Sequence, residues 1–291
     1  MQLAHVGPRG RERPIVRGPD GPGYDLRRLT ERIDGPFLAD RGIERIRDEL
    51  AHDRLEPVDL DGQRFGAPIA RPQKLLCIGL NYRDHAREAG LPVPEEPILF
   101  GKANNTVSGP DDPLLLPPSS TATDWEVELA VVIGSQARYL SHPDDAWGYI
   151  AGFAISHDVS ERHWQHERGG QWIKGKSFET FNPLGPWLVP RDDIGDVGSL
   201  RLQLRVNGEI RQDGNTSEMI FNVEHLVWYL SQFLVLEPGD VINTGTPAGV
   251  GMGSQPPTYL QEGDEVELAI EGLGTQRHPC QRASWAGKND A

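Results

Sequence analysis

Three carboxylates alternate along one short stretch of the chain, Asp124, Glu126 and Glu128 in DWEVELAVVIG. β-branched residues dominate the second half of this stretch and Gly134 closes it, which is typical of a β-strand. Successive side chains of a strand point to opposite faces, so the three carboxylates share one face. Burying them unpaired would be costly. Either water solvates this face at a sheet edge, or a hard cation such as Mg²⁺, Mn²⁺ or Ca²⁺ binds there.

A histidine and a glutamate three positions apart form a second candidate group. His85 and Glu88, in NYRDHARE, would lie on the same side of a short helix over residues 81–89. A carboxylate beside an imidazole fixes its tautomer and stabilises its protonated form, so the pair could act as a general base. The alternative is an ordinary ion pair on an exposed helical turn.

Further charged residues follow predicted strands. Asp158 ends a second apolar strand and could complete the oxygen set begun by Glu126 and Glu128, or it could simply accept hydrogen bonds from the next turn. Lys102 and Lys176 each stand beside a glycine, which lets a ligand approach closely, and an ammonium can meet a carboxylate or an enolate. Each lysine could equally be a surface charge.

Two polar segments complete the set of candidates. Residues 243–251 form a glycine-dense turn whose amides, with the Thr246 hydroxyl, could bind a ligand carboxylate. Residues 160–175 contain Arg162 and Gln165 and are predicted to be a mobile polar loop. Neither segment has the spacing of a phosphate-binding loop, a dinucleotide fingerprint or a serine-nucleophile elbow.

Composition limits the class of protein. The 291 residues carry a net charge of −14, which argues against nucleic acid as a partner. No run of about 18 apolar residues predicts a membrane span, and two distant cysteines favour a reduced cytoplasm over a disulfide framework. With 33 glycines and 24 prolines, many short strands are expected in place of long helices.

The chain divides into a small N-terminal unit, residues 1–70, and a larger domain, residues 73–287. Asn207-Gly208 between two alternating runs is a strong hairpin signal. Apolar spacing predicts a helix over residues 217–234. Strands are predicted at residues 2–6, 13–17, 74–80, 152–158, 241–244 and 265–270.

The order of these motifs closely resembles the fumarylacetoacetate hydrolase superfamily over roughly residues 73–287. The matching runs are GLNYxxHxxE from Gly79, FxK ending at Lys102, DxExELAxVIG from Asp124, DVSxRxxQ from Asp158, GKSFxT from Gly175 and TGTPxGVG from Thr244. The resemblance implies a mostly β (α+β) fold, a mixed β-sandwich or β-roll catalytic domain, and a homodimer.

The resemblance also implies roles for individual residues. Glu126, Glu128 and Asp158 would bind Mg²⁺ or Mn²⁺, and Asp124 would support them from behind. His85 and Glu88 would be the catalytic pair, with Lys176 stabilising an enolate. The implied substrate contacts are Tyr82, Lys102, Arg162, Gln165 and Thr246.

The implied reaction is hydrolysis of a carbon–carbon bond in a 2,4-dioxo acid to pyruvate and a second acid. Segments 169–176, 182–187 and 256–260 are most similar to hydrolases of 2,4-diketo-3-deoxy-L-fuconate and L-rhamnonate. Residues 177–179, SFE, are also common in isomerases and lyases. An isomerase or decarboxylase of homoprotocatechuate-type dicarboxylates or oxaloacetate is therefore the alternative, with Arg83 or Arg87 as a second cation. A non-enzymatic ligand-binding relative is a third interpretation.

Overall fold

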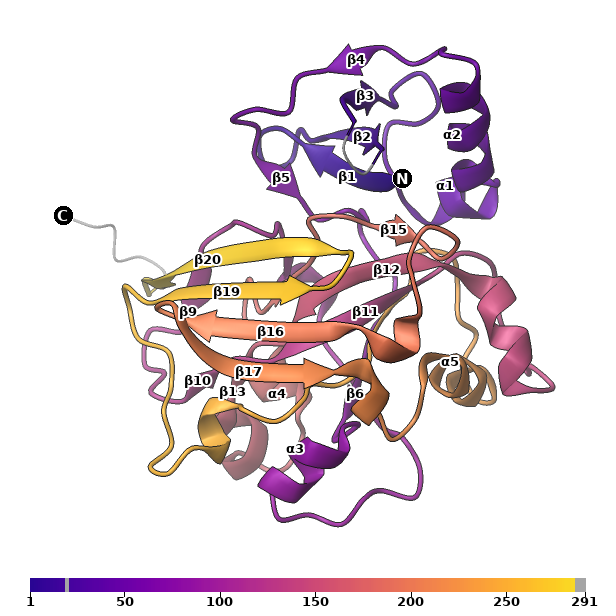
Figure 1. Cartoon of the computed structure of the whole chain (residues 1–291). Coiled ribbons are helices and arrows are strands. Elements are labelled where there is room, and N and C mark those ends of the chain that lie inside the picture. The colour runs from indigo at the N-terminus through magenta and orange to yellow at the C-terminus, as the bar shows by residue number, and fades with distance from the viewer. Residues whose placement is uncertain (19–20, 286–291) are drawn as a thin grey trace.

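The computed structural model describes residues 1–18 and 21–285, so positions 286–287 of the predicted larger domain lie outside the described residues. The N-terminal region forms a five-stranded antiparallel sheet in the order β4-β3-β2-β1-β5, with two helices beside it (Figure 1). Its elements are β1 Gln2–Val6, β2 Arg13–Arg17, β3 Gly23–Asp25, α1 Gly35–Ala39, α2 Gly42–Ala51, β4 Pro57–Val58 and β5 Phe65–Gly66.

A mixed six-stranded sheet forms the centre of the molecule, in the order β15-β12-β11-β18-β6-β7. Only β18 and β6 pair in parallel among these strands. The bounds are β6 Leu75–Gly79, β7 Ile98–Gly101, β11 Val127–Ile133, β12 Ile150–His157, β15 Val189–Pro190 and β18 Val241–Asn243. Two short ribbons flank this sheet, β10 Thr123–Asp124 with β13 Ser160–Glu161, and β8 Val107–Ser108 with β14 Asn182–Pro183.

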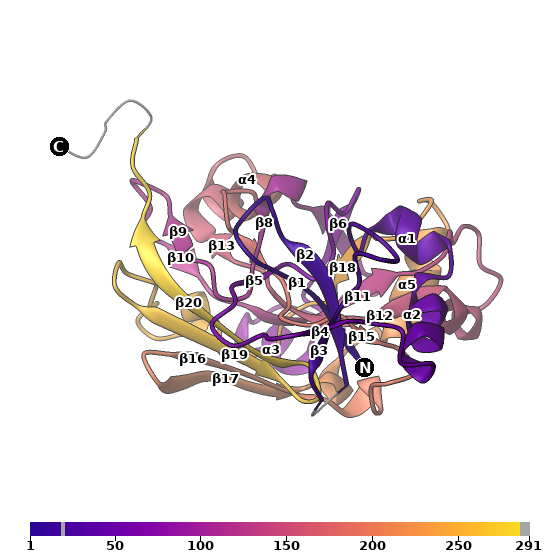
Figure 2. The same ribbon diagram turned by 90° about the horizontal axis from the view of Figure 1, so that it is seen from above.

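A second five-stranded sheet, in the order β17-β16-β19-β20-β9, packs on one face of the central sheet (Figures 1 and 2). Its strands are β9 Leu114–Leu116, β16 Arg201–Val206, β17 Glu209–Asn215, β19 Glu265–Ile270 and β20 Gly274–Arg282. Asn207 and Gly208 both have positive φ, 52° and 80°, as the predicted two-residue hairpin turn requires. The prediction of a mostly β fold with two packed sheets is confirmed.

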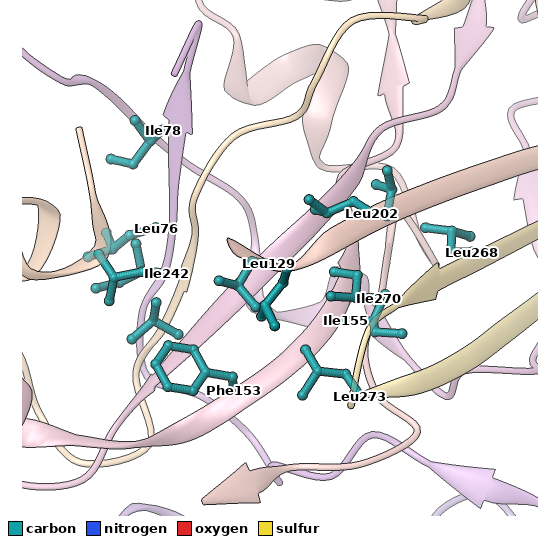
Figure 3. Packing of buried hydrophobic residues seen from close by; sticks show 14 of the residues in the cluster. Leu76, Ile78, Leu129, Phe153, Ile155, Leu202, Ile242, Leu268, Ile270 and Leu273 are labelled. Carbon is teal, nitrogen blue, oxygen red and sulfur yellow. The ribbon is translucent and has the colours of Figure 1, made fainter. Parts of the chain in front are cut away.

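The core lies between these two sheets. Leu129, Phe153 and Ile155 of the central sheet meet Leu202 and Leu268 of the second sheet, all with fully buried side chains (Figure 3). Alternate residues of β11 point the other way and join a second cluster with the N-terminal region. Both faces of β11 are therefore buried, so the solvated-edge interpretation of its acidic residues is wrong.

The helices are short. They are α3 Arg83–Glu88, α4 Ile173–Lys176 and α5 Val223–Ser231, with 3₁₀ turns at Asn104–Thr106, Pro143–Tyr149, Val197–Ser199, Thr216–Glu218 and Gly251–Gly253 and a π turn at His163–Glu167. The helix predicted from residue 217 starts six residues later, because the Asn222 side chain caps it by accepting from the His225 amide at 3.0 Å. Within the described residues, no helix has the length and apolarity needed to cross a bilayer.

The N-terminal sheet joins the central sheet directly. Leu3 and Leu188 exchange two backbone hydrogen bonds of 2.9 and 2.8 Å. The buried His5 ring bridges two other segments: Nδ1 lies 2.8 Å from the Ala67 carbonyl, and Nε2 accepts from the Ile33 amide at 3.0 Å. Only the neutral ring can satisfy both contacts, and burial lowers the pKa of His5 below its ordinary value.

We expect His5 to make folding pH-dependent. Because its folded pKa lies below the unfolded value near 6.5, the unfolded chain takes up the proton first as the pH falls. Stability contributed by neutral His5 is present above pH 6.5 and is lost as the pH falls towards the folded pKa. His5→Gln keeps one donor and one acceptor, so unfolding free energy at pH 7.5 should change by less than about 1.5 kcal/mol.

Chemical denaturation between pH 7.5 and 5 measures this effect. The loss of stability on acidification should be smaller in His5→Gln than in the parent protein. His52→Gln, at an exposed position, is the matched control and should retain the full loss. An unchanged slope in His5→Gln would contradict the assignment.

Candidate active site

The three predicted ligand carboxylates converge. Glu126 immediately precedes β11 and Glu128 is its second residue, and the antiparallel pairing of β11 with β12 places Asp158 beside them. The Asp158 amide donates to the Glu126 carbonyl at 3.0 Å. One oxygen from each carboxylate lies within 4.8 Å of the others, and all three side chains are buried.

Two buried lysines neutralise part of this cluster. The Lys176 ammonium donates to both Glu126 and Asp158 at 2.7 Å. Lys102 donates to the other Asp158 oxygen and to the Phe181 carbonyl, both at 2.5 Å. The surface-charge interpretation of both lysines is therefore wrong, because neither exposes more than 4% of its area.

Asp124 and Arg162 form a second layer behind the cluster. Arg162 binds Asp124 at 2.8 Å and Glu126 at 2.7 Å. Asp124 also accepts from the amides of Trp125, Gly251 and Met252 at 2.7 to 2.9 Å. Both Asp124 oxygens are therefore occupied by Arg162 and by backbone amides, and its supporting role at a metal site stays a prediction.

The segment predicted to be a mobile loop contains short regular elements, and these contacts involve its two ends. Residues 160–175 contain β13, the π turn and the start of α4. Gly175 packs so closely that a Cβ there would lie 2.5 Å from both the Gln165 amide nitrogen and the Glu161 carbonyl oxygen. Arg162 also donates to Gln165 at 2.9 Å. Glu161, Arg162 and Gln165 are buried near the carboxylates, whereas residues 166–171 are exposed. The prediction of a continuous loop is therefore wrong, and the mobility of the segment stays a prediction.

Charge balance in the centre leaves one carboxylate unpaired. The buried cations pair with Asp124, Glu126 and Asp158, and in the described part of the chain Glu128 accepts only from the Gly245 amide, at 2.8 Å. Burial, with the charges of Asp158 and Glu126, raises the pKa of Glu128 well above its ordinary value. Burial alone would raise the pKa of Glu126. The positive charges of Lys176 and Arg162 have the larger effect, so the pKa of Glu126 is lowered.

The residues fit a divalent cation. An octahedral ion with oxygens at ~2.1 Å places its ligand oxygens roughly 3–4 Å apart, and one oxygen of each carboxylate here lies within 4.8 Å of the others. All donors are carboxylate oxygens, the type that Mg²⁺ and Mn²⁺ prefer. An unpaired, buried Glu128 supplies the negative charge that such an ion would neutralise. The cluster could therefore hold a metal through Glu126, Glu128 and Asp158.

The His85–Glu88 pair lies next to this centre on α3. His85 Nδ1 is 3.0 Å from Glu88, whose other oxygen accepts from the Gly249 amide at 2.9 Å. Both side chains are mostly buried, 12% and 19% exposed, which disfavours an ordinary surface pair. His85 is close enough to act electrostatically on Glu126. With Nδ1–H directed at Glu88, the Nε2 lone pair is the basic position.

Two predicted substrate contacts are occupied or enclosed. The Thr246 hydroxyl lies 2.9 Å from the Val127 carbonyl and accepts from Gln212 at 2.8 Å. Tyr82 is fully buried, and its hydroxyl has no partner among the described residues. Gln212, 85 positions after Val127, also accepts from the Val127 amide at 2.9 Å. No sequence signal indicated this role for Gln212.

His157 is a second residue that the motifs did not indicate. It precedes Asp158 on β12, is fully buried, and stacks on His278 with ring centroids 5.5 Å apart. Neither of its ring nitrogens has a partner among the described residues. Burial lowers the pKa of His157 well below its ordinary value, so this ring is neutral behind the carboxylate centre.

A buried carboxylate cluster beside a histidine–glutamate pair, on a two-sheet β scaffold, defines this protein as an enzyme of the fumarylacetoacetate hydrolase type. The model of the fumarylacetoacetate (FAA) hydrolase C-terminal family matches residues 74–281. The chain belongs to this family.

Similar proteins cover almost the whole chain. A Burkholderia multivorans protein named "Putative hydrolase" is 49% identical, over 95% of this chain and 97% of its own. The structure of 5-carboxymethyl-2-hydroxymuconate delta-isomerase from Mycobacterium smegmatis has a TM-score of 0.77 and 31% sequence identity. The match covers 98% of this chain and 100% of the isomerase chain. Maleylpyruvate hydrolase from Sphingobium sp. SYK-6, in complex with manganese(II) and pyruvate, has a TM-score of 0.80, 26% identity and the same coverage.

Proposed function

We propose that this enzyme hydrolyses a carbon–carbon bond in a 2,4-dioxo acid, releasing pyruvate and a second carboxylic acid. The observation that carries the proposal is the His85–Glu88 pair at 3.0 Å beside the carboxylate centre. A reaction that only forms an enolate needs no base to deprotonate water, whereas hydrolysis does. The similarity to a maleylpyruvate hydrolase that binds manganese and pyruvate supports the same class.

The chain's own residues provide the proton transfers. His85 Nε2 would take a proton from water, while Glu88 holds the ring and stabilises its charge. The water oxygen then bonds to the 4-oxo carbon. On collapse, the C3–C4 bond breaks and its electron pair passes to C3, which forms a pyruvate enolate and the second acid. A proton returned to C3 completes pyruvate.

Charges around the centre favour the enolate. Lys176 and Lys102 keep two buried ammonium groups at the carboxylates, where anionic oxygens of an oxo acid would bind. A divalent cation on Glu126, Glu128 and Asp158 would supply Lewis-acid polarisation when bound. The resemblance of residues 169–176, 182–187 and 256–260 to hydrolases of 2,4-diketo-3-deoxy-L-fuconate and L-rhamnonate supports a sugar acid within this substrate class.

A second candidate reaction is isomerisation or decarboxylation of a 2-oxo or 2-hydroxy-diene dicarboxylate. The similarity to the mycobacterial delta-isomerase, at 31% identity, favours it. A dicarboxylate needs another cation at its far end. Arg83 donates to the Met219 carbonyl at 2.7 Å and is therefore engaged, which leaves the exposed Arg87 of the two predicted arginines.

A turnover assay with Mg²⁺, Mn²⁺ or EDTA separates these reactions. Its substrates are acylpyruvates, maleylpyruvate, 2,4-diketo-3-deoxy-L-fuconate and L-rhamnonate, oxaloacetate and a 2-hydroxy-diene dioate. We expect pyruvate and a second acid from a 2,4-dioxo acid, and at least ~100-fold slower turnover in EDTA. CO₂ release or isomerisation alone would establish the second candidate. Full activity in EDTA would refute the metal site.

A further inference from the structure

A cavity of about 700 Å³ lies between the N-terminal sheet and the segment that contains β8. Its walls come from the β1–β2 turn and from residues 27–32, 64–72 and 104–112, and they include no residue of the carboxylate centre or of the His85–Glu88 pair. This volume is within the range of small-molecule binding sites. The cavity is therefore large enough for a ligand of its own, separate from the catalytic centre.

Arginine dominates the lining of this cavity. Three carboxylates also line it, Glu12, Glu31 and Asp112. The arginines are Arg9, Arg11, Arg13, Arg27, Arg32, Arg64 and Arg71. A guanidinium does not lose its proton in proteins, so repulsion between arginines that these carboxylates do not neutralise is left to solvent or to a bound anion.

The cationic lining contrasts with the rest of the chain. Residues 1–71 contain thirteen arginines, no lysine and thirteen acidic residues, so the whole net charge of −14 belongs to residues 72–291. Arginine in place of lysine is the choice that suits planar, two-pronged recognition of phosphate or carboxylate. The cavity thus concentrates positive charge in an otherwise acidic protein.

Some of these arginines already have partners. Arg64 binds Asp112 through two hydrogen bonds of 2.7 Å and Glu12 through one of 2.9 Å, which links the N-terminal sheet to the 109–112 segment. Arg27 pairs with Asp25 at 2.7 Å. Arg13 also lies 3.6 Å from Asp25. Three of the seven lining arginines are therefore paired, and two of the three lining carboxylates, Glu12 and Asp112, are already bound by Arg64.

Four lining arginines form no ion pair or side-chain hydrogen bond within residues 1–18 and 21–285: Arg9, Arg11, Arg32 and Arg71. Arg9 is nevertheless near enough to Asp112 to act on it electrostatically. The four arginines come from three separate places, namely the β1–β2 turn, the approach to α1 and the junction before β6. Glu31 is the lining carboxylate that remains to offset them. The fold therefore gathers several free guanidinium groups around one volume.

We propose that this cavity binds a small polyanion carrying at least two phosphate or carboxylate groups. Each free guanidinium can form paired hydrogen bonds to such a group, and an anion with two groups can engage arginines from different segments at once. A single monovalent anion would leave most of the positive charge unmatched. The cavity shares no lining residue with the catalytic centre.

Calorimetric titration with pyrophosphate and with citrate, at fixed ionic strength and without divalent cations, tests the proposal and distinguishes phosphate from carboxylate. We expect saturable binding of one molecule per chain to at least one of the two probes. The double variant Arg32→Gln/Arg71→Gln should bind at least ten-fold more weakly, since it removes guanidinium groups from two walls. Arg138→Gln, an exposed arginine outside the cavity, should bind like the parent protein.

Thermal unfolding without ligand checks that the double variant folds, and Arg9→Gln/Arg11→Gln provides an independent pair on the β1–β2 turn. Absence of saturable binding to either probe would overturn the proposal. Equal affinity of the parent protein and both double variants would also overturn it, because the anion would then bind elsewhere. Equal weakening by Arg138→Gln would show only non-specific charge attraction and would equally reject the site.

Discussion

Glu128→Gln is expected to abolish turnover and to weaken Mn²⁺ binding by at least ~100-fold, while making the metal-free protein more stable. A change outside the ligand set typically costs ~10–100-fold in metal affinity, so loss of a ligand should cost no less. Glutamine preserves the size of the side chain and its hydrogen bond from the Gly245 amide. It removes the carboxylate that has no cationic partner in the described structure.

The opposite effect on stability follows from that unpaired charge. Burial and neighbouring carboxylates raise the pKa of Glu128, so ionising it at neutral pH costs folding free energy. Without metal, we expect Glu128→Gln to gain about 1–3 kcal/mol in unfolding free energy. Calorimetric Mn²⁺ titration and denaturation in EDTA measure the two effects separately.

The matched control is Glu161→Gln. Glu161 is also buried, but its oxygens accept from Ser120 at 3.0 Å and from the Trp164 amide at 2.8 Å, and it belongs to the neighbouring β10–β13 ribbon. If the ion is bound by specific ligand residues and not by buried negative charge in general, the Mn²⁺ affinity of this control should stay within about three-fold of the parent value. Parent-like Mn²⁺ binding in Glu128→Gln would reject its role as a ligand.

His85→Gln is expected to lower kcat on the hydrolysed oxo acid by about 10²–10⁴-fold, the usual contribution of a general base. Mn²⁺ affinity should stay within about three-fold, because His85 is not among the clustered carboxylate ligands. Steady-state kinetics would measure the loss of kcat, and calorimetric titration would measure the unchanged Mn²⁺ affinity. Glu88→Gln should cause a smaller loss of kcat and a shift in its pH profile, because the ring would keep a partner but lose its stabilising charge.

A second histidine–glutamate pair supplies the control for His85. His163 Nδ1 lies 3.0 Å from Glu167, the same distance as in the His85–Glu88 pair, but these side chains are 44% and 71% exposed. His163→Gln should leave kcat nearly unchanged. If His85→Gln hydrolysed the substrate as fast as the parent protein, another group would have to activate water.

Alternation and turn chemistry in the sequence predicted much of the local structure. The Asn207-Gly208 turn, the strands of residues 2–6 and 13–17 and the period-2 placement of Glu126 and Glu128 are local patterns, set by backbone preference and strand geometry. The order of six motifs also identified the family, which the match over residues 74–281 confirms. The individual site roles remain predictions for the variants above to test.

The sequence by itself determined which residues could do chemistry, because residue type and short-range spacing are local properties. Only the tertiary structure decided their partners: Lys176 lies 50 positions from Glu126, and Lys102 lies 56 positions from Asp158. The register between β11 and β12 brings the carboxylates together. Because both faces of β11 are buried, these charged side chains form one desolvated centre and not a solvated surface. The arginine-lined cavity has the same origin, since its free guanidinium groups come from three segments that only folding brings together.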